Sequence, residues 1–297
     1  MSVVSNKIRT STSRKVFCVI NYTVLTLLGL ACVLPMWHVV CASLSDPMAL
    51  AINKGLILWP LGPVTEQGYV LMFGNKNILG GFLNTLFYVG VGTLINTALT
   101  IMGGYALSRK TFLWRNIAMV FISFTMLFNG GMIPTYIVVT QLGLYDSRWA
   151  LILPTAVSVF NLIVMRTSMQ EIPDSLEESA KLDGAGHWRI MWSILLPVSK
   201  ATVAVITLFY AVGNWNAWFN AMLYLQDRSK YPLQLIMREI VMQNTQGTSS
   251  ALSSMTDIYR PLVKYAVIVF STLPILVVYP FAQKYFVKGV MIGSIKG

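Results

Sequence analysis

The sequence EIPDSLEESAKLDGAGHWRIMWSILLP, residues 171–197, lies between two long apolar segments and holds five of the eleven acidic residues in the chain. Pro173 fixes the entry to a predicted helix. Ser175 is placed to cap that helix, with Glu178 three residues later as its reciprocal partner in a capping box. The stretch therefore predicts a short capped helix in a chain that is otherwise mostly apolar.

The predicted helix presents Leu176 and Ala180 on one face at i, i+4 spacing. The residues DGAG, 183–186, then end it, because glycine reaches left-handed backbone angles without steric cost. A second short helix is predicted over His187–Trp192, and Pro197 stops it from continuing into the next apolar segment. Two short helices around a glycine turn, placed between apolar segments, indicate a docking element.

Three groups of residues in this stretch keep a recognisable spacing: Glu178-Ser179-Ala180, Asp183-Gly184-Ala185 and Ile194-Leu195-Leu196-Pro197. Together they resemble the EAA loop in the permease subunits of binding-protein-dependent ABC importers. In that family the loop forms a coupling helix that sits in a groove of the cytosolic ATPase. Ser179 stands where the family usually has alanine, and it keeps a small side chain there.

The resemblance implies that this loop couples the chain to an ATPase. The residues that take this role are Glu177, Glu178, Ser179, Ala180, Asp183, Gly184, Ala185, Leu196 and Pro197. The sequence contains no Walker A pattern, so ATP hydrolysis is expected on separate subunits. The alternative interpretation is an ordinary acidic loop between membrane helices.

Composition indicates a membrane protein. Hydrophobic residues make up 55% of the chain and charged residues 11%, whereas soluble domains carry about 25% charged residues. A net charge of +11 would suggest nucleic-acid binding in a soluble protein, but basic loops of a membrane protein report its orientation. The three cysteines all fall in the first apolar segment, which favours buried thiols over a disulfide framework or a metal site.

Six apolar segments without charged residues are predicted to be membrane helices. A helix needs about 20 residues to cross about 30 Å of hydrocarbon. The segments are Val16–Ser45, Asn77–Ser108, Asn116–Tyr145, Trp149–Met165, Ala201–Gln226 and Tyr265–Gln283. Trp149–Met165 is the shortest, and it can extend past Arg166 because that side chain can snorkel. The expected fold is an all-α integral membrane protein with six transmembrane helices, the type I ABC importer permease fold that the resemblance implies.

Basic residues predict the orientation of these helices. The apolar run Val16–Val40 is longer than the about 7–15 apolar residues of a secretory signal, so it is expected to be an uncleaved first helix. The basic segment before it then lies in the cytosol. In this arrangement fourteen of the 22 basic residues fall in cytosolic segments and eight in external loops, as the positive-inside rule expects. Both termini and residues 171–197 are then cytosolic.

A single transmembrane permease domain is predicted over residues 1–297. Its cytosolic parts are a basic N-terminus at 1–15, the coupling loop at 171–197 and a C-terminal tail at 285–297. Residues 288–297 resemble the glycine-rich tail of the maltose-type membrane subunit, which reaches into the ATPase dimer. This resemblance implies ATPase contacts for Gly293, Lys296 and Gly297, and a frayed chain end is the equal alternative.

Polar side chains within the apolar segments are expected to face protein or water, because an unpaired amide in hydrocarbon is costly. The densest group is NWNAWFN, residues 214–220, with three amides and two tryptophans. It resembles the Trp-Asn signature in the fifth helix of carbohydrate-type permeases, and Asn216 and Asn220 would share a helix face at i, i+4 spacing. We interpret this group as the lining of a sugar pathway, and Asn96 and Asn161 as contacts between helices.

The third apolar segment contains NGGMIP, residues 129–134, which predicts a break because Gly-Gly followed by proline weakens the helix hydrogen-bond ladder. Asn129 and Tyr136 are candidates for the pathway at this break, and a simple kink is the alternative. The predicted pathway residues are Asn84, Asn129, Tyr136, Asn214, Trp215, Asn216, Trp218 and Asn220.

Catalytic and metal-binding motifs are absent from the sequence. It has no H-E-x-x-H, no cysteine–histidine cluster and no G-x-S-x-G pattern, so a non-enzymatic subunit without a metal or cofactor of its own is expected. No acidic residue lies within an apolar segment, which argues against a carrier coupled to protons or sodium ions.

These observations predict the permease subunit of an ATP-driven importer that moves a carbohydrate, with an oligosaccharide favoured, by alternating access. The resemblance implies a homologous second permease, two ATP-binding subunits that hold ATP and magnesium, and an extracytoplasmic solute-binding protein. It also implies a multi-pass location in lipid, in the bacterial cytoplasmic membrane. The binding protein would dock on the outer loops, Asp46–Gly80 and Asp227–Arg260. The alternatives are a permease for a non-sugar solute, a secondary carrier and a membrane scaffold.

Overall fold

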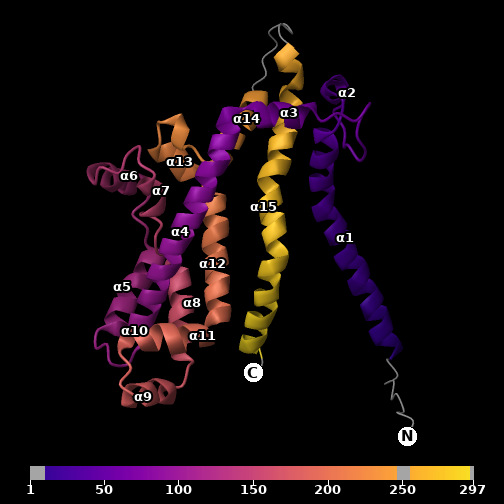
Figure 1. Cartoon of the computed structure of the whole chain (residues 1–297). Helices are drawn as coiled ribbons and strands as arrows, with labels where there is room; N and C mark the ends of the chain where they lie inside the picture. The colour runs from indigo at the N-terminus through magenta and orange to yellow at the C-terminus, as the bar shows by residue number, and fades with distance from the viewer. Residues whose placement is uncertain (1–10, 246–254, 295–297) are drawn as a thin grey trace. The chain divides into compact units, whose positions relative to one another are not determined.

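The computed structural model of the chain describes residues 11–245 and 255–294 (Figure 1). Within these ranges every regular element is a helix, so the all-α class is confirmed. The chain divides into two compact units, Met1–Met72 with Thr248–Val269 and Phe73–Gly247 with Phe270–Gly297.

The helices in chain order are α1 (Thr12–Ser43), α2 (Pro47–Ile52), α3 (Gln67–Gly74), α4 (Lys76–Ser108), α5 (Arg115–Leu127), α6 (Met132–Gln141), α7 (Trp149–Ile152), α8 (Val159–Gln170), α9 (Asp174–Leu182), α10 (His187–Ile190), the π-helix η1 (Met191–Leu195), α11 (Leu196–Val198), α12 (Lys200–Trp215), α13 (Phe219–Tyr224), the 3-10 turn η2 (Arg228–Lys230), α14 (Leu233–Thr245) and α15 (Met255–Ser294).

In the first unit, the last turns of α1 pack against α2, the loop that follows it and α15. The buried core holds Cys41, Ala42, Leu50, Ile57 and Leu262. The remainder of α1 exposes its apolar side chains, as a helix in contact with lipid or another membrane subunit does. Cys41 is buried, but Cys32 is exposed and Cys18 is half-buried, so the expectation of buried thiols holds for Cys41 alone.

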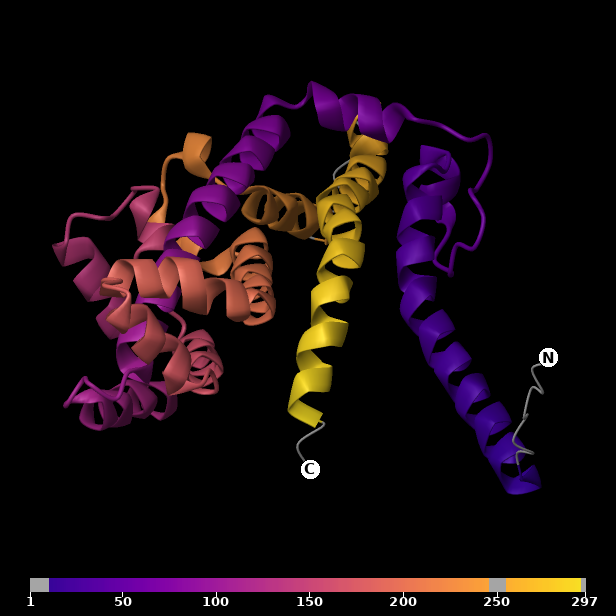
Figure 2. The same cartoon turned by 60° about the horizontal axis from the view of Figure 1, so that its bottom comes forward.

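In the second unit, α4 is the central helix and contacts α5, α8, α12 and α14 (Figure 2). Two glycines let its neighbours approach closely. A Cβ at Gly104 would lie 2.8 Å from the side chain of Met165 on α8, and a Cβ at Gly92 would lie 2.9 Å from the Nδ2 of Asn214 on α12. A larger residue at Gly104 would meet the base of the Met165 side chain and the backbone of Arg166 and push α8 away from α4, whereas one at Gly92 would displace the amide of Asn214.

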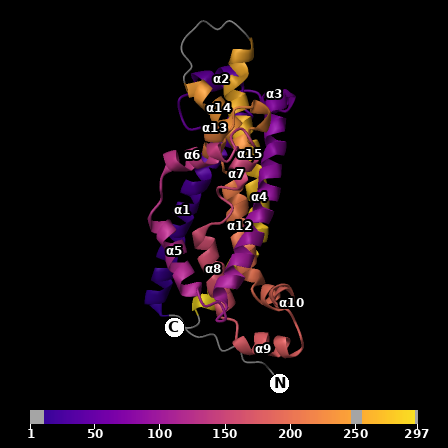
Figure 3. The same cartoon turned by 90° about the vertical axis from the view of Figure 1, so that its left-hand side faces the viewer.

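The two ends of this second unit hold different elements. At one end α6 and α13 pack around the apolar side chains of Val139, Leu151 and Tyr224. At the other end lie α9 and α10 (Figure 3), where Ala180 packs with Ile190.

Three helices in the described ranges are long and apolar enough to cross a membrane: Thr12–Ser43, Lys76–Ser108 and Ile258–Pro280. Two bent pairs pass the same test together: Arg115–Leu127 with Met132–Gln141, and His187–Val198 with Lys200–Trp215. The structure thus gives three to five candidate spans, and six stays a prediction.

Three of the six predicted segments are interrupted: Asn116–Tyr145 at its predicted break, and two others where no break was predicted. Trp149–Met165 is divided because α7 ends at Ile152 and α8 begins only at Val159. Pro154 lies between these helices, and proline cannot donate the backbone hydrogen bond that a continuous helix needs. Ala201–Gln226 is divided between α12 and α13.

The predicted break at residues 129–134 is confirmed, and it is larger than a kink. The axes of α5 and α6 differ by 115°. Gly131 has a φ of 89°, which a side chain would strain, and its N–H donates to the Oδ1 of Asn129 at 2.9 Å.

Candidate functional site

The start of α9 differs from the prediction. Pro173 occupies the N-cap position, and no side chain caps the helix. The helix therefore begins at Asp174, which places Ser175 inside the first turn, so the predicted capping box of Ser175 with Glu178 is wrong. Asp174 and Glu177 instead place negative charge in the first turn, where the helix dipole favours it.

The buried face of α9 is formed by Glu177 and Ala180. Leu176 and Ala180 lie four residues apart in this helix, as predicted, but Leu176 is 45% exposed and does not join the buried face.

Glu177 pairs with Arg109, the residue that follows α4, and the two side chains are 9% and 8% exposed. Arg109 also donates from Nη2 to the carbonyl oxygen of Met169 at 2.8 Å and from Nε to the Oγ of Ser108 at 2.9 Å. Lys181 binds the second carboxylate oxygen of Glu177 at 2.7 Å. Arg109 thereby joins α4, α8 and α9 at one point.

Electrostatics keep Glu177 ionised. Burial raises the pKa of its carboxyl, but hydrogen bonds from Lys181 and Arg109 outweigh burial and leave the pKa below its ordinary value. A second pair, Lys110 with Asp174, links the same two segments at the surface.

The glycine turn after α9 is confirmed. Gly184 has a φ of 77°, and α10 begins at His187. The helical run then continues through η1 and α11 and ends at Val198, one residue after Pro197. The chain bends by 87° before α12, so the run does not continue into the next apolar segment, as predicted.

The outer surface of this end is open to a partner. Of the residues predicted to couple to an ATPase, Glu178, Ser179, Asp183, Gly184 and Pro197 are exposed, Ala185 and Leu196 are half-buried, and Glu177 and Ala180 are buried. Leu182 and Trp188 add exposed apolar surface. Of the predicted tail contacts, Gly293 lies in the last turn of α15, and Lys296 and Gly297 lie outside the described residues.

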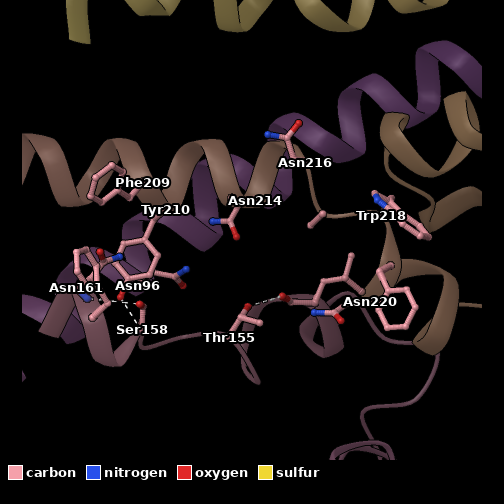
Figure 4. A pocket seen from close by; sticks show the side chains of 15 residues that line it. Asn96, Thr155, Ser158, Asn161, Phe209, Tyr210, Asn214, Asn216, Trp218 and Asn220 are labelled. Atoms are coloured by element: carbon pink, nitrogen blue, oxygen red, sulfur yellow. Dashed lines mark hydrogen bonds between the residues drawn. The ribbon is translucent and has the colours of Figure 1, made fainter. Parts of the chain in front are cut away.

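An open cavity of about 540 Å³ lies in the second unit, between α4, α8, α12 and α13 (Figure 4). Its polar lining consists of five amides and three hydroxyls: Asn96, Asn161, Asn214, Asn216, Asn220, Thr155, Ser158 and Tyr210. Its apolar lining includes the rings of Phe160, Phe209, Trp218 and Phe219. None of the lining residues in the described ranges carries a charge.

Hydrogen bonds fix part of this lining. The hydroxyl of Tyr210 accepts from the backbone N–H of Ser158 at 2.8 Å and bonds the Oγ1 of Thr100 at 2.7 Å. Asn214 donates to the Oγ1 of Thr93 at 3.3 Å. Asn96 is 1% exposed, and its Oδ1 has no hydrogen-bond partner among the described residues.

Residues 96–292 match the family described as "Binding-protein-dependent transport system inner membrane component". The chain belongs to this family. The match includes both the α9 region and the residues around the cavity, and it makes this permease an integral membrane protein. The EAA motif and the coupling helix, which the sequence predicted for the α9 region, are features of this family.

Relatives extend over nearly the whole permease. It is 43% identical over 285 residues to the polygalacturonan/rhamnogalacturonan transport system permease protein YtcP of Bacillus subtilis, covering 95% of this chain and 99% of that protein. It is 26% identical to the arabinooligosaccharides transport system permease protein AraQ of the same organism, and the match covers 85% of this chain and 81% of that protein. The permease also resembles a chain in the crystal structure of a bacterial ABC transporter involved in the import of the acidic polysaccharide alginate. The TM-score is 0.85 at 29% identity, and the match covers 94% of this chain and 100% of that chain.

Four predicted pathway residues of the permease line the cavity: Asn214, Asn216, Trp218 and Asn220. Asn216 and Asn220 do not share a helix face, because α12 ends at Trp215 and α13 begins at Phe219. The turn between these helices still brings both amides to one cavity (Figure 4).

The other four predicted pathway residues lie elsewhere in the permease. Trp215 is buried on the far side of α12 and donates to the carbonyl oxygen of Ser271 at 3.1 Å. Asn84 donates to Ser229 and Tyr231 carbonyls and accepts from Arg148. Asn129 is exposed at the α5–α6 break, and Tyr136 stacks on Tyr224.

Sequence reasoning missed several residues that line the cavity. Asn96 and Asn161 were expected to form contacts between helices, yet both border it. Tyr210 lies four residues before Asn214 on α12, so both project from one side of the helix. The i, i+4 spacing of Tyr210 and Asn214 is the signal in the sequence that places Tyr210 beside the cluster at 214–220.

Proposed function

We propose that this permease forms the membrane pathway of an ATP-driven importer for oligosaccharides. One observation carries the proposal: five amides and several aromatic rings line one cavity that has no charged residue among its described lining. Amides donate and accept hydrogen bonds, and a sugar presents hydroxyls that do the same.

The lining matches the two kinds of surface that a sugar presents. Each amide both donates and accepts, as a hydroxyl does. Aromatic rings such as Trp218 and Phe209 can cover the apolar C–H face of a sugar ring. The relatives named above for polysaccharide and arabinooligosaccharide transport support the same class of cargo.

The proposed assembly adds a homologous second permease, two ATP-binding subunits that hold ATP and magnesium, and an extracytoplasmic solute-binding protein. The permease would cross the bacterial cytoplasmic membrane six times with both termini in the cytosol. Membership in a binding-protein-dependent family favours this assembly over a secondary carrier or a scaffold.

The coupling step would pass through α9. In the proposal its exposed face, with Glu178 and Gly184, docks on the ATPase. The buried Arg109–Glu177 pair ties α9 to α4, the helix that borders the cavity. A movement of the ATPase could therefore reach the cavity wall through α4.

Uptake by the reconstituted transporter tests the pathway. The double variant Asn216→Leu with Asn220→Leu removes two amides that line the cavity, so we expect labelled oligosaccharide uptake to fall by about tenfold or more. ATP hydrolysis without substrate should stay near the wild-type rate, because α9 is unchanged.

The matched control is Asn77→Leu, which removes an exposed amide in the first turn of α4, away from the cavity. It should leave uptake unchanged. Wild-type uptake by the double variant would contradict the proposed pathway.

A further inference from the structure

Arg238 of α14 lies against the wall of the cavity. Its guanidinium carbon is 4.3 Å from the centre of the Trp218 ring, and Trp218 lines the cavity. Figure 4 shows Trp218 at the same end of the cavity as Asn220. The guanidinium therefore lies directly beside a ring of the cavity wall, although Arg238 is not itself a lining residue.

No carboxylate neutralises Arg238 in the part of the chain that the structure describes. The adjacent Glu239 pairs with Arg228 at 2.7 Å instead. Arg238 donates from Nη1 to the Sδ of Met222 at 3.0 Å, and a thioether is only a weak acceptor. The Trp218 ring holds the guanidinium by a cation–π contact, which leaves its remaining N–H groups for a ligand.

We propose that Arg238 selects for carboxylated sugars, so that the cargo of this permease is an acidic, uronate-containing oligosaccharide. The inference rests on the proposed function and narrows its substrate class. The relatives alone do not fix the charge of the cargo, because they include proteins named for polygalacturonan and for arabinooligosaccharides.

The chemistry of the two side chains supports this assignment. A guanidinium binds a carboxylate through two parallel N–H···O bonds, and these charge-assisted bonds are stronger than those of a neutral amide. A sugar ring packed on Trp218 would hold its carboxylate within reach of Arg238. Because the described lining is uncharged, Arg238 is the residue that distinguishes an acid from a neutral sugar of the same shape.

The test compares one oligosaccharide in two charge states. The intact transporter, with its binding protein and ATPase, is reconstituted in liposomes and given labelled trigalacturonate or its neutral methyl ester. Arg238→Gln should lower uptake of the acid by about tenfold or more and change uptake of the ester by less than about twofold. Each rate is divided by the wild-type rate for the same compound, so the contribution of the binding protein cancels.

Two further variants sharpen the result. Arg238→Lys keeps the charge and loses the bidentate fork, so it should retain more uptake of the acid than Arg238→Gln does. Lys76→Gln makes the same change of charge at an exposed position in the first turn of α4 and should leave the acid-to-ester ratio unchanged.

Several outcomes would overturn the inference. An equal loss for acid and ester in Arg238→Gln would mean that Arg238 only supports Trp218. The wild type could carry trigalacturonate but not its ester. In that case an equal loss of trigalacturonate uptake in Arg238→Gln and Arg238→Lys would overturn the inference. Higher trigalacturonate uptake by Arg238→Lys than by Arg238→Gln would support it. Wild-type uptake of arabinooligosaccharide but of neither galacturonate compound would refute the inference and leave the proposed function standing. A wild type that carries no oligosaccharide at all would refute both.

Discussion

Arg109, directly after α4, and Glu177, in the first turn of α9, form a buried ion pair between the central helix of the second unit and the predicted coupling helix. Removing one member of such a pair leaves the other charged and buried, which costs more than the pair itself contributes. The position of α9 therefore depends on a residue 68 positions earlier in the chain.

Replacing Arg109 with glutamine should weaken this connection. Lys181 remains beside Glu177, so we expect a loss of about 2–3 kcal/mol rather than the full cost of an isolated buried charge. Thermal unfolding in detergent measures the stability, and substrate-stimulated ATP hydrolysis measures the coupling, which should also decrease. The control is Lys110→Gln at the exposed Lys110–Asp174 pair, which should change neither. Equal effects of the two variants would show that burial of the pair is unimportant.

Replacing Gly184 with aspartate should uncouple ATP hydrolysis from uptake while the protein stays in the membrane. Any side chain at its φ of 77° is strained by about 1 kcal/mol, and the new carboxylate stands beside Asp183 on the exposed surface. Gly186→Ala is the matched control, because Gly186 has an ordinary φ of −72° and open space around its Cβ position. Normal uptake by Gly184→Asp, measured with ATP hydrolysis in liposomes, would refute this role for the turn.

Asp146 should make the loop end of the second unit sensitive to acid. The pKa of the Asp146 carboxyl is lowered to about 2. The causes are a hydrogen bond from the backbone N–H of Asp227, the ion pair with Lys230 and a hydrogen bond from the backbone N–H of Gln226. The folded pKa lies below the ordinary value of about 3.9, so the stabilisation is complete above about pH 4 and is lost as the pH falls toward 2. Asp146→Asn keeps the shape, and asparagine tolerates the φ of 53° at this residue.

Thermal unfolding between pH 2 and pH 7 checks this expectation. The difference between wild type and Asp146→Asn should be constant near neutral pH and shrink in acid. Glu171→Gln, at an exposed position near α9, controls for the loss of one negative charge. A wild-type-to-variant difference that does not change with pH would count against the Asp146 contacts.

Tyr210→Phe should disturb the cavity from within α12. It removes the hydroxyl that accepts from the Ser158 N–H and bonds Thr100, which leaves the buried Thr100 hydroxyl and the half-buried Ser158 N–H without that partner, at a cost of about 1–3 kcal/mol. Both oligosaccharide uptake and thermal stability should fall. Tyr22→Phe, at an exposed position on α1, should change neither, and unaltered uptake by Tyr210→Phe would argue that the Ser158 position is not needed.

The local features of this protein were predictable because their causes lie within a few residues. Gly184 follows the end of α9 at a positive φ, as predicted, and Gly131 lies at the predicted break, where it precedes α6. The cluster at 214–220 does border a cavity. Even so, the helix-face argument for Asn216 and Asn220 was wrong, since it assumed a helix that stops at Trp215.

The long-range features were not predictable from one sequence. Arg109 was counted only as a basic residue near a membrane helix, because nothing local shows that it pairs with Glu177. Asn96 and Asn161 lie on different helices and meet at the cavity only through the packing of α4, α8 and α12. The interruption of Trp149–Met165 shows the same limit, since apolar composition does not reveal whether a segment is one helix.

The amides that line the cavity bear on how long a cargo would stay. Water satisfies an amide about as well as a sugar hydroxyl does, so a sugar entering the proposed pathway exchanges one hydrogen bond for another at little net gain. A lining built from such amides gives orientation without tight retention. Residence would then be brief, and the high affinity needed to collect a scarce sugar would reside in the external binding protein rather than in the membrane.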